Sequence, residues 1–260
     1  MKTIALVNNK GGVGKTTSAV SLAAGIAAEG HRCLLADLDA QGSASLSLGI
    51  ARADLSPGAA EVILEGRLIR EAIRPSSVKG LSILPGSMKL ASADLALSDV
   101  KGREAVLKNA LKPILADYDF AVLDCPPSLG LLTVNALTAA DFFLVPLTLD
   151  YLALEGLVNL LEAVELIRAG IGKTAAPLGF LLTLADNRLN VTEEIAGMIR
   201  KHYGRLVFKT VIPGNVKLKE APSFGKTIFD YDAGSAGAEA YRELTKEVLH
   251  RLGRHDIKTA

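Results

Sequence analysis

A glycine-rich segment near the start of the chain constrains the fold more than any other feature. Residues 10–17 read KGGVGKTT, and they follow a short apolar run at residues 3–8. Apolar residues then recur at helical spacing as far as Gly30, which is a suitable helix stop. The order strand, glycine-rich turn and helix predicts a phosphate cradle. Glycines let backbone N–H groups turn inward, and the N-terminus of the helix attracts an anion.

The chemistry of this segment predicts a nucleotide site that uses magnesium. Lys15 is expected to reach the β and γ phosphates, and the Thr16 hydroxyl is placed to ligate Mg²⁺. The strict pattern GxxxxGK[ST] has a glycine where Asn9 stands. A turn without a ligand is the alternative, but eight matched positions in the right context argue against it. The predicted nucleotide contacts are Lys10, Gly11, Gly12, Val13, Gly14, Lys15, Thr16 and Thr17.

Lys10 adds a second cation at the start of the loop. It would repel Lys15 unless the site holds more negative charge than Lys15 alone neutralises. The γ-phosphate of an ATP would supply that charge, bound either by the same chain or by a facing copy of it. In the second case Lys10 would play the role of an arginine finger in a homodimer.

Three aspartates follow predicted strands and form a candidate catalytic group. Asp37 and Asp39 come after the apolar run 33–36, and Asp124 follows residues 120–123. A lone aspartate in such a place is usually a turn or helix cap. Beside a phosphate loop, the three indicate phosphoryl transfer. We expect Asp39 to position the attacking water, Asp124 to belong to the Mg²⁺ shell and Asp37 to support the metal.

The rest of the chain predicts an α/β fold. Short apolar strands are expected at residues 81–84, 142–145, 178–183 and 206–212, and helices at 59–64, 103–116, 152–168, 193–203 and 238–252. This alternation is typical of a doubly wound, mostly parallel sheet with helices on both faces. In such sheets ligands bind beyond the carboxyl ends of the strands. The absence of repeats and linkers in 260 residues favours a single domain over 1–260.

Bulk composition restricts the function classes. The chain is 49% hydrophobic with a formal net charge of +1, so any contact with nucleic acid should be a local patch. Two cysteines, Cys33 and Cys125, without CxxC spacing support neither a disulfide framework nor a zinc cluster. No secretory signal opens the sequence, and no window reaches the length of a membrane span. We expect a cytoplasmic protein.

Several motifs together resemble one known family. They are KGGVGKTT, DLDAQGSAS at residues 37–45, LDCPPSLG at 123–130, YLALEGL at 151–157, IPGNVKLKEAPSFGK at 212–226 and YDAGSAGAEAYREL at 231–244. Across essentially the whole chain, the sequence resembles the ParA/Soj-type chromosome- and plasmid-partitioning ATPases. These are P-loop NTPases with a deviant Walker A motif, in the MinD/ParA superfamily.

The resemblance implies a nucleotide-sandwich dimer in which Lys10 contacts the ATP of the partner, with Asp39 needed for hydrolysis of ATP to ADP and phosphate. It also implies ATP-dependent, sequence-nonspecific DNA binding on the nucleoid, and weak ATPase activity that a ParB-like centromere-binding partner stimulates. Family positions near adenine correspond to Asn187, Pro213 and Asn215. The family commonly has arginine where Gly214 and Lys217 stand, which leaves the geometry of DNA contact open.

A basic stretch is the candidate DNA surface. Residues 187–226 carry eight basic and three acidic side chains, a local surplus of five positive charges. A solvated helix face is the alternative. A dimer would double the patch, and contact should be with the DNA backbone because no base-reading motif is present. The predicted DNA contacts are Arg188, Lys217, Lys219 and Lys226.

Other functions share parts of this pattern. A MinD-like membrane ATPase would need an amphipathic C-terminal anchor, whereas residues 251–260 have scattered apolar side chains and are expected to fray. A metal-cluster carrier would need paired thiolates at a dimer interface. A binder without turnover would not need Lys15, Thr16, Asp39 and Asp124. A related ATPase that positions a protein cluster or microcompartment on DNA stays open. The early first strand leaves no room for a preceding helix-turn-helix module.

Overall fold

The computed structural model describes residues 1–150, 153–185 and 190–259. All strands in this part of the chain form one sheet, in the order β3-β4-β2-β5-β1-β6-β7-β8. Every pairing is parallel except that of β3 with β4. The strands are β1 (Lys2–Leu6), β2 (Cys33–Asp37), β3 (Arg74–Pro75), β4 (Leu81–Leu84), β5 (Phe120–Asp124), β6 (Phe142–Thr148), β7 (Ala176–Ala185) and β8 (Val207–Pro213).

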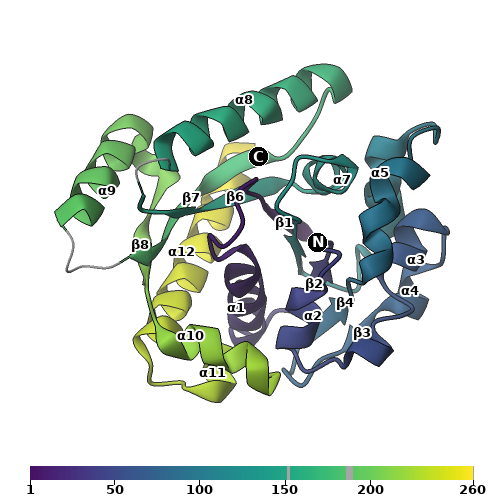
Figure 1. Ribbon diagram of the computed structural model, residues 1–260, viewed down its shortest axis with the longest axis horizontal. Coiled ribbons are helices and arrows are strands. Elements are labelled where there is room, and N and C mark those ends of the chain that lie inside the picture. The colour runs from purple at the N-terminus through teal and green to yellow at the C-terminus, as the bar shows by residue number, and fades with distance from the viewer. Residues whose placement is uncertain (151–152, 186–189, 260) are drawn as a thin grey trace.

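Helices cover both faces of this sheet (Figure 1). One face packs against α1 and α12, which also pack on each other, and the other packs against α3, α6, α7, α8 and α9. The doubly wound, mostly parallel α/β fold is therefore confirmed. The α-helices are α1 (Lys15–Ala28), α2 (Ser43–Ser47), α3 (Ala59–Leu64), α4 (Ile69–Ala72), α5 (Ala93–Ala96), α6 (Val106–Leu111), α7 (Leu131–Ala139), α8 (Ala153–Ile171), α9 (Asn190–Tyr203), α10 (Val216–Glu220), α11 (Ile228–Tyr231) and α12 (Ala236–Thr259).

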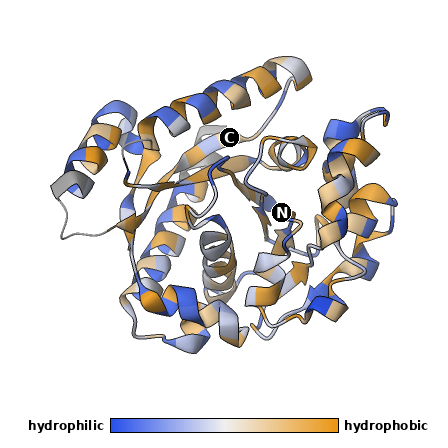
Figure 2. Ribbon diagram, in the orientation of Figure 1, coloured by the Kyte–Doolittle hydropathy of each residue, from blue (hydrophilic) through white to orange (hydrophobic). Residues whose placement is uncertain are grey.

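The central strands are apolar because both of their faces are covered. Every residue of β2 and β5 is buried, and their sequences CLLAD and FAVLD are apolar up to the last position. The outer helices are amphipathic instead, as the alternation of blue and orange along α8 in Figure 2 shows. No helix within the described ranges is both long and apolar enough to cross a membrane.

Three segments differ from the sequence expectations. Residues 103–116 form short pieces, with α6 between two 3-10 turns, because Pro113 lacks the N–H that a continuous helix would need. Helix α7 was not predicted. At the C-terminus, α12 extends to Thr259 rather than fraying beyond Leu252.

The topology gathers the predicted site at one edge of the sheet. Strand β1 lies between β5 and β6, and β5 lies beside β2. In the parallel register, Asp124 pairs with Leu6 on one side and with Asp37 on the other. The segments that follow β1, β2, β5 and β6 therefore leave the sheet next to one another, at its carboxyl edge.

Candidate functional site

The glycine-rich loop connects β1 to α1. Gly14 caps α1 with φ +82°, in the left-handed region that favours glycine, and Lys15 begins the helix. The Thr183 hydroxyl from β7 lies 2.9 Å from the Val13 carbonyl and 3.0 Å from that of Leu147. This hydroxyl fixes the loop to the ends of two strands, a role that the sequence did not indicate. Lys10, Gly11 and Gly12 are exposed, whereas Thr16 and Thr17 are half-buried.

Lys15 is buried at the centre of the loop, with 7% of its surface exposed. Its Nζ donates a hydrogen bond to the carbonyl of Lys10 at 2.9 Å. Burial lowers the pKa of Lys15, and the nearby carboxylates of Asp124 and Asp39 oppose that shift. The loop therefore holds a desolvated amino group among acidic side chains, which is an arrangement suited to a polyanion.

Asp124 is the least compensated polar group of the site. Its side chain is fully buried, and neither carboxylate oxygen has a hydrogen-bond partner in the described structure. Burial, and then the charge of Asp37, raise the pKa of Asp124 well above its usual range, while the nearby Thr16 hydroxyl lowers it. Burying an unpaired carboxylate is costly, so its presence here indicates a functional role.

Asp37 is also fully buried, but protein donors surround it. Oδ2 accepts hydrogen bonds from the amide and the hydroxyl of Ser45, at 2.9 and 2.8 Å. Oδ1 accepts one from the amide of Asp39 at 3.2 Å. Burial raises the pKa of Asp37 in spite of these donors. Asp37 thus organises the turn after β2.

That turn presents Asp39, which is half-buried and accepts a hydrogen bond from the Gln41 amide at 3.0 Å. Gly86 closes over the turn, and its amide donates to the Ser45 hydroxyl at 3.1 Å. A Cβ at Gly86 would lie 2.7 Å from the Asp39 carbonyl and 2.8 Å from Cγ of Asp37. Sequence reasoning missed both Ser45 and Gly86. Only the motif DLDAQGSAS pointed to Ser45, whereas Gly86 is distant in sequence.

Lys10 has a partner that sequence reasoning also missed. Its Nζ lies 2.6 Å from Oδ2 of Asp150, an ion pair whose side chains are about half exposed, 48% for Lys10 and 42% for Asp150. The Thr148 hydroxyl donates to the same oxygen at 2.6 Å. Like Asp37 and Asp124, Asp150 is an acidic residue at the end of a central strand. Its position just after β6 could have identified it as a candidate site residue.

These residues fit a divalent cation held together with phosphate. Among the described residues, no group of three His, Cys, Asp or Glu side chains could hold a metal ion unaided. Magnesium in nucleotide sites needs only one or two protein ligands, because phosphates and waters complete its shell. The orphaned carboxylate of Asp124 and the half-buried hydroxyl of Thr16 can supply these ligands. Asp37, the neighbour of Asp124 in the register of β2 and β5, would support the metal site without being a direct ligand.

The predicted adenine and DNA residues that the structure describes lie at the end of β8, on α10 and in the segment that follows α10. Pro213 ends β8 opposite Ala185 of β7, and Asn215 caps α10 by accepting a hydrogen bond from the Lys217 amide at 2.7 Å. Asn187 and Arg188 fall outside the described residues. Among the predicted DNA contacts, Lys219 and Lys226 are exposed, whereas Lys217 is half-buried and pairs with Glu220 at 3.0 Å.

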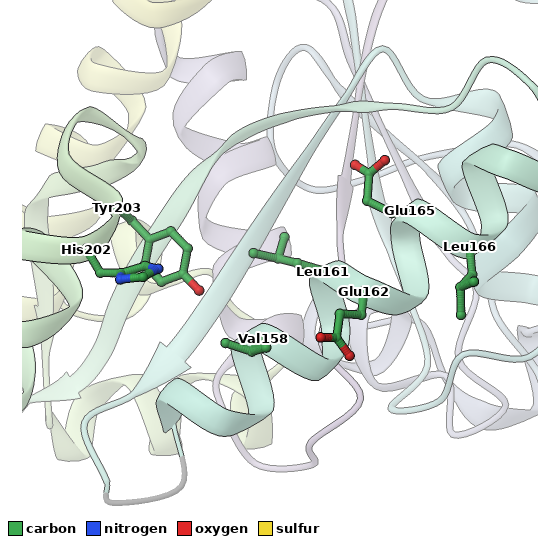
Figure 3. Close-up of a pocket in the computed structure, with 7 residues that line it drawn as sticks. All are labelled: Val158, Leu161, Glu162, Glu165, Leu166, His202 and Tyr203. Carbon is green, nitrogen blue, oxygen red and sulfur yellow. The ribbon is translucent and has the colours of Figure 1, made fainter.

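Two other features have no predicted role in the phosphate site. Helices α8 and α9 enclose a groove of about 660 Å³ whose lining includes Leu161, Leu166 and Tyr203, with Glu162 at its side (Figure 3). Cys33 and Cys125 are both buried, in the cores on opposite faces of the sheet. Burial raises the pKa of both thiols, so neither presents a reactive thiolate.

Known proteins are similar in sequence to most of this chain. The family model described as an AAA domain matches residues 1–176. The chromosome partitioning protein ParA of Myxococcus xanthus is 42% identical over 248 residues, which cover 95% of this chain and 88% of that protein. The sporulation initiation inhibitor protein Soj of Bacillus subtilis is 44% identical, with coverage of 95% and 98%.

Solved structures agree on the fold. A cobyrinic acid a,c-diamide synthase from Mycobacterium smegmatis, with bound ADP and magnesium, superposes with a TM-score of 0.85 at 33% identity. The alignment covers 97% of this chain and 96% of that chain. The ATP complex of a Cyanothece McdA variant gives a TM-score of 0.86 with 96% coverage of both chains, at 22% identity, and so supports the fold alone.

The relatives named for partitioning match at higher identity than these structures, and they match nearly from end to end. The same three site segments, KGGVGKTT, DLDAQGSAS and LDCPPSLG, form the described phosphate loop and its acidic neighbours. The chain therefore belongs to the ParA/Soj family of chromosome-partitioning ATPases.

Proposed function

We propose that this chain is a Mg²⁺-dependent ATPase that closes into a homodimer around ATP. In that state it binds DNA without sequence preference and drives segregation of a chromosome or plasmid with a ParB-like partner. The observation that carries the proposal is the pairing of a buried lysine with an orphaned buried carboxylate. Burial lowers the pKa of Lys15, and neither carboxylate oxygen of Asp124 has a hydrogen-bond partner among the described residues, so the site holds a buried cation and a carboxylate that is available to a ligand.

The phosphate loop would bind the nucleotide in cis. Backbone N–H groups of residues 11–14 and the N-terminus of α1 favour an anion, and α1 is 14 residues long. Lys15 would exchange the Lys10 carbonyl for phosphate oxygens, and Thr17 completes the loop. Pro213, Asn215 and Asn187 would contact the adenine. The structural neighbour that is 33% identical was solved with bound ADP and magnesium, which supports nucleotide binding by this chain.

Hydrolysis would depend on the turn that follows β2. Asp39 would orient a water toward the γ-phosphate, while Thr16 and Asp124 hold the metal and Asp37 fixes the turn. When bound, Mg²⁺ would neutralise charge on the phosphate oxygens. Because Lys10 and the partner protein must be in place first, intrinsic turnover should be slow.

Dimerisation would bring each Lys10 to the nucleotide of the other chain. The side chain of Lys10 is about half exposed, at the start of a loop whose Lys15 is buried. A second chain could therefore accept it without any rearrangement of the sheet. The ATP-bound dimer would then persist until hydrolysis releases the γ-phosphate.

The DNA surface would lie on α10 and the turn that follows it. Lys219 and Lys226 are exposed, Lys217 is half-buried, and Phe224, between Lys219 and Lys226 in the sequence, is also exposed. Arg188, which falls outside the described residues, would add its charge to this surface. One such patch would bind weakly, but a dimer presents two, which raises affinity steeply through phosphate neutralisation and effective concentration. The protein would thus associate with the nucleoid only in its ATP form.

The direct test is DNA binding by the purified protein with no nucleotide, with ADP and with ATP, over a salt series. We expect binding with ATP alone. Lys15→Gln should abolish it, and Asp39→Ala should prolong it because the dimer no longer turns over.

Stable folding of both variants, checked by circular dichroism, would assign any loss to the nucleotide site. Equal DNA binding in every nucleotide state would contradict control of DNA binding by ATP. An absence of binding at low salt would contradict DNA binding itself. Addition of the ParB-like partner should raise ATP turnover of the parent protein but not of Asp39→Ala.

A further inference from the structure

We propose that Phe224 is the platform of a single-stranded DNA site, on which an unpaired base stacks while lysines of the same segment neutralise phosphates. The segment, residues 216–231, contains α10, the 3-10 turn Ala221–Phe224 and α11, and the two helices lie side by side (Figure 1). The inference deepens the proposed function and rests on it for the basic surface. It goes further because contact with duplex phosphates requires no aromatic side chain.

The ring of Phe224 is exposed although its backbone is fixed. Phe224 ends the 3-10 turn and has 64% of its surface exposed. Gly225 follows with φ +62°, and its amide donates to the Pro222 carbonyl at 3.1 Å, which closes the turn. A Cβ at Gly225 would lie 2.6 Å from the Cα of Gly49, so the turn also packs closely on the segment that follows α2. The exposed ring is therefore presented by a closed and supported turn.

One face of the Phe224 ring rests on Tyr231. The two ring centroids are 5.1 Å apart and the rings are inclined by 27°, a stacked arrangement. Tyr231 is held in turn, because its hydroxyl donates to Oε2 of Glu220 at 3.0 Å and Nζ of Lys217 lies 5.7 Å from its ring centroid. The same Glu220 oxygen accepts Lys217 at 3.0 Å. The ring pair thus offers the other face of Phe224 to a further planar group.

The charges of the segment favour an anionic ligand. Lys219 and Lys226 are exposed, and neither forms an ion pair with a residue that the structure describes. The two acidic side chains of the segment are engaged within it. Glu220 accepts the hydrogen bonds given above, and the Asp230 carboxylate accepts the Thr227 hydroxyl at 2.7 Å. An exposed aromatic ring together with unpaired ammonium groups matches a nucleotide, which offers a planar base and a phosphate.

This combination distinguishes a single strand from a duplex. In a duplex the faces of each base are covered by the neighbouring base pairs, whereas a single strand exposes them. Stacking on an aromatic ring tolerates every base, because each base has a π face. Lysines neutralise phosphates in both forms of DNA. Affinity for a duplex should therefore depend on the lysines alone, and affinity for a single strand on the lysines and on Phe224.

The first test compares a labelled oligothymidine with a duplex of the same length, by fluorescence anisotropy at low salt with ATP and Mg²⁺. Phe224→Ala should weaken binding of the single strand about tenfold, as expected for the loss of one stacked base, and change binding of the duplex by less than about twofold. Tyr231→Leu removes the supporting ring and should weaken binding of the single strand about threefold. Tyr231→Phe keeps that ring and should bind like the parent.

A second measurement reports the stacking itself. The chain contains no tryptophan, so Phe224→Trp introduces a single indole at the proposed platform. Oligothymidine should quench its fluorescence with the same midpoint that anisotropy gives, because a base stacks on the indole. Leu166→Trp is the matched control, since Leu166 is 75% exposed on α8 and lies outside the segment. Its fluorescence should not change when the single strand binds.

Several results would overturn the inference. If Phe224→Ala weakens binding of both forms of DNA equally, or of neither, Phe224 does not stack on an unpaired base. An indole at position 224 that oligothymidine does not quench leads to the same conclusion. A lower dimer fraction of Phe224→Ala with ATP, measured by analytical ultracentrifugation, would show that a second copy of the chain covers the ring instead.

The parent protein separates this inference from the proposed function. Binding of the duplex without binding of the single strand would overturn the inference alone. Binding of the single strand without binding of the duplex would overturn the proposed duplex contact and leave the stacking site in place. An absence of binding to either form would overturn both.

Discussion

Asp37 and Asp124 are direct partners in the parallel register of β2 and β5, and both side chains are fully buried. They differ in how their charges are compensated. Asp37 accepts hydrogen bonds from Ser45 and from the Asp39 amide, whereas both oxygens of Asp124 are orphaned. This asymmetry divides the two carboxylates into one that organises the turn and one that is available for a ligand.

The first prediction concerns the stability cost of Asp124. Asp124→Asn removes a buried charge without removing any hydrogen bond of the structure, so it should raise the melting temperature of the protein without nucleotide. A gain of about 1 kcal/mol corresponds to about 2–4 °C for a chain of this size. The same variant should lose the extra thermal stability that Mg²⁺ and ATP confer on the parent. Differential scanning fluorimetry measures both effects.

The pH dependence of this variant has a definite sign. The pKa of Asp124 is raised in the folded chain, so folding favours its protonated form. Its destabilising effect is absent below the ordinary carboxyl pKa, and it grows as pH rises through that value toward the raised one. The advantage of Asp124→Asn in free energy of unfolding should therefore increase with pH. An advantage that shrinks with pH would show that Asp124 is stabilised as a carboxylate.

The second prediction tests the turn that holds Asp39. Gly86→Ala places a methyl group 2.7 Å from the Asp39 carbonyl, a distance at which backbone must shift. We expect ATP hydrolysis to fall at least about tenfold because a misplaced water-positioning group commonly costs that much or more. ATP affinity should change little, since the phosphate loop is not touched. Isothermal titration calorimetry and a phosphate-release assay separate the two.

Gly156→Ala is the matched control, because a Cβ at this position on α8 meets nothing within 4 Å. Alanine also favours a helix by about 1 kcal/mol over glycine, so the control should keep its activity and gain slight stability. Equal loss of activity in the two variants would mean that the effect of Gly86→Ala does not arise from the Asp39 turn.

The third prediction concerns the basic surface. Reversal of charge in Lys219→Glu with Lys226→Glu should weaken DNA binding equally for all sequences. It should also flatten the dependence of log affinity on log salt by about 0.9 for each phosphate that the protein no longer neutralises. Lys79→Glu, at an exposed position on the turn before β4, serves as the control. An unchanged salt slope in the double variant would place the DNA surface elsewhere.

Much of the fold follows from local patterns. The strands at residues 33–37, 81–84 and 120–124 are continuous apolar runs, and each ends at a polar residue or turn, so their bounds were predicted within one or two residues. Helix α7 was missed because the few polar residues of LLTVNALTA are themselves buried and do not form the polar face that marks an outer helix. It packs into the core beside Asp94, whose carboxylate accepts the Leu131 amide at 2.7 Å.

The candidate site was predictable where motifs are contiguous and not where tertiary contacts assemble it. Lys15 and Asp124 followed from a loop and a strand end. Asp150, Thr183 and Gly86 did not, because each acts through a partner that is distant along the chain, such as Lys10 or Val13. Sheet order decides these contacts, and no local pattern specifies that β6 lies next to β1.

The most direct test of the account is a mixture of two inactive chains. Lys10→Ala can bind ATP but supplies no lysine, and Lys15→Gln supplies Lys10 but cannot hold ATP. In a mixed dimer, the ATP of the first chain would face Lys10 of the second. We predict that neither chain alone forms dimers or hydrolyses ATP above background, whereas an equimolar mixture recovers both, with at most one working site per dimer. If the mixture remained monomeric and inactive, or if Lys10→Ala alone dimerised like the parent, Lys10 would not act across a dimer and the central claim would be wrong.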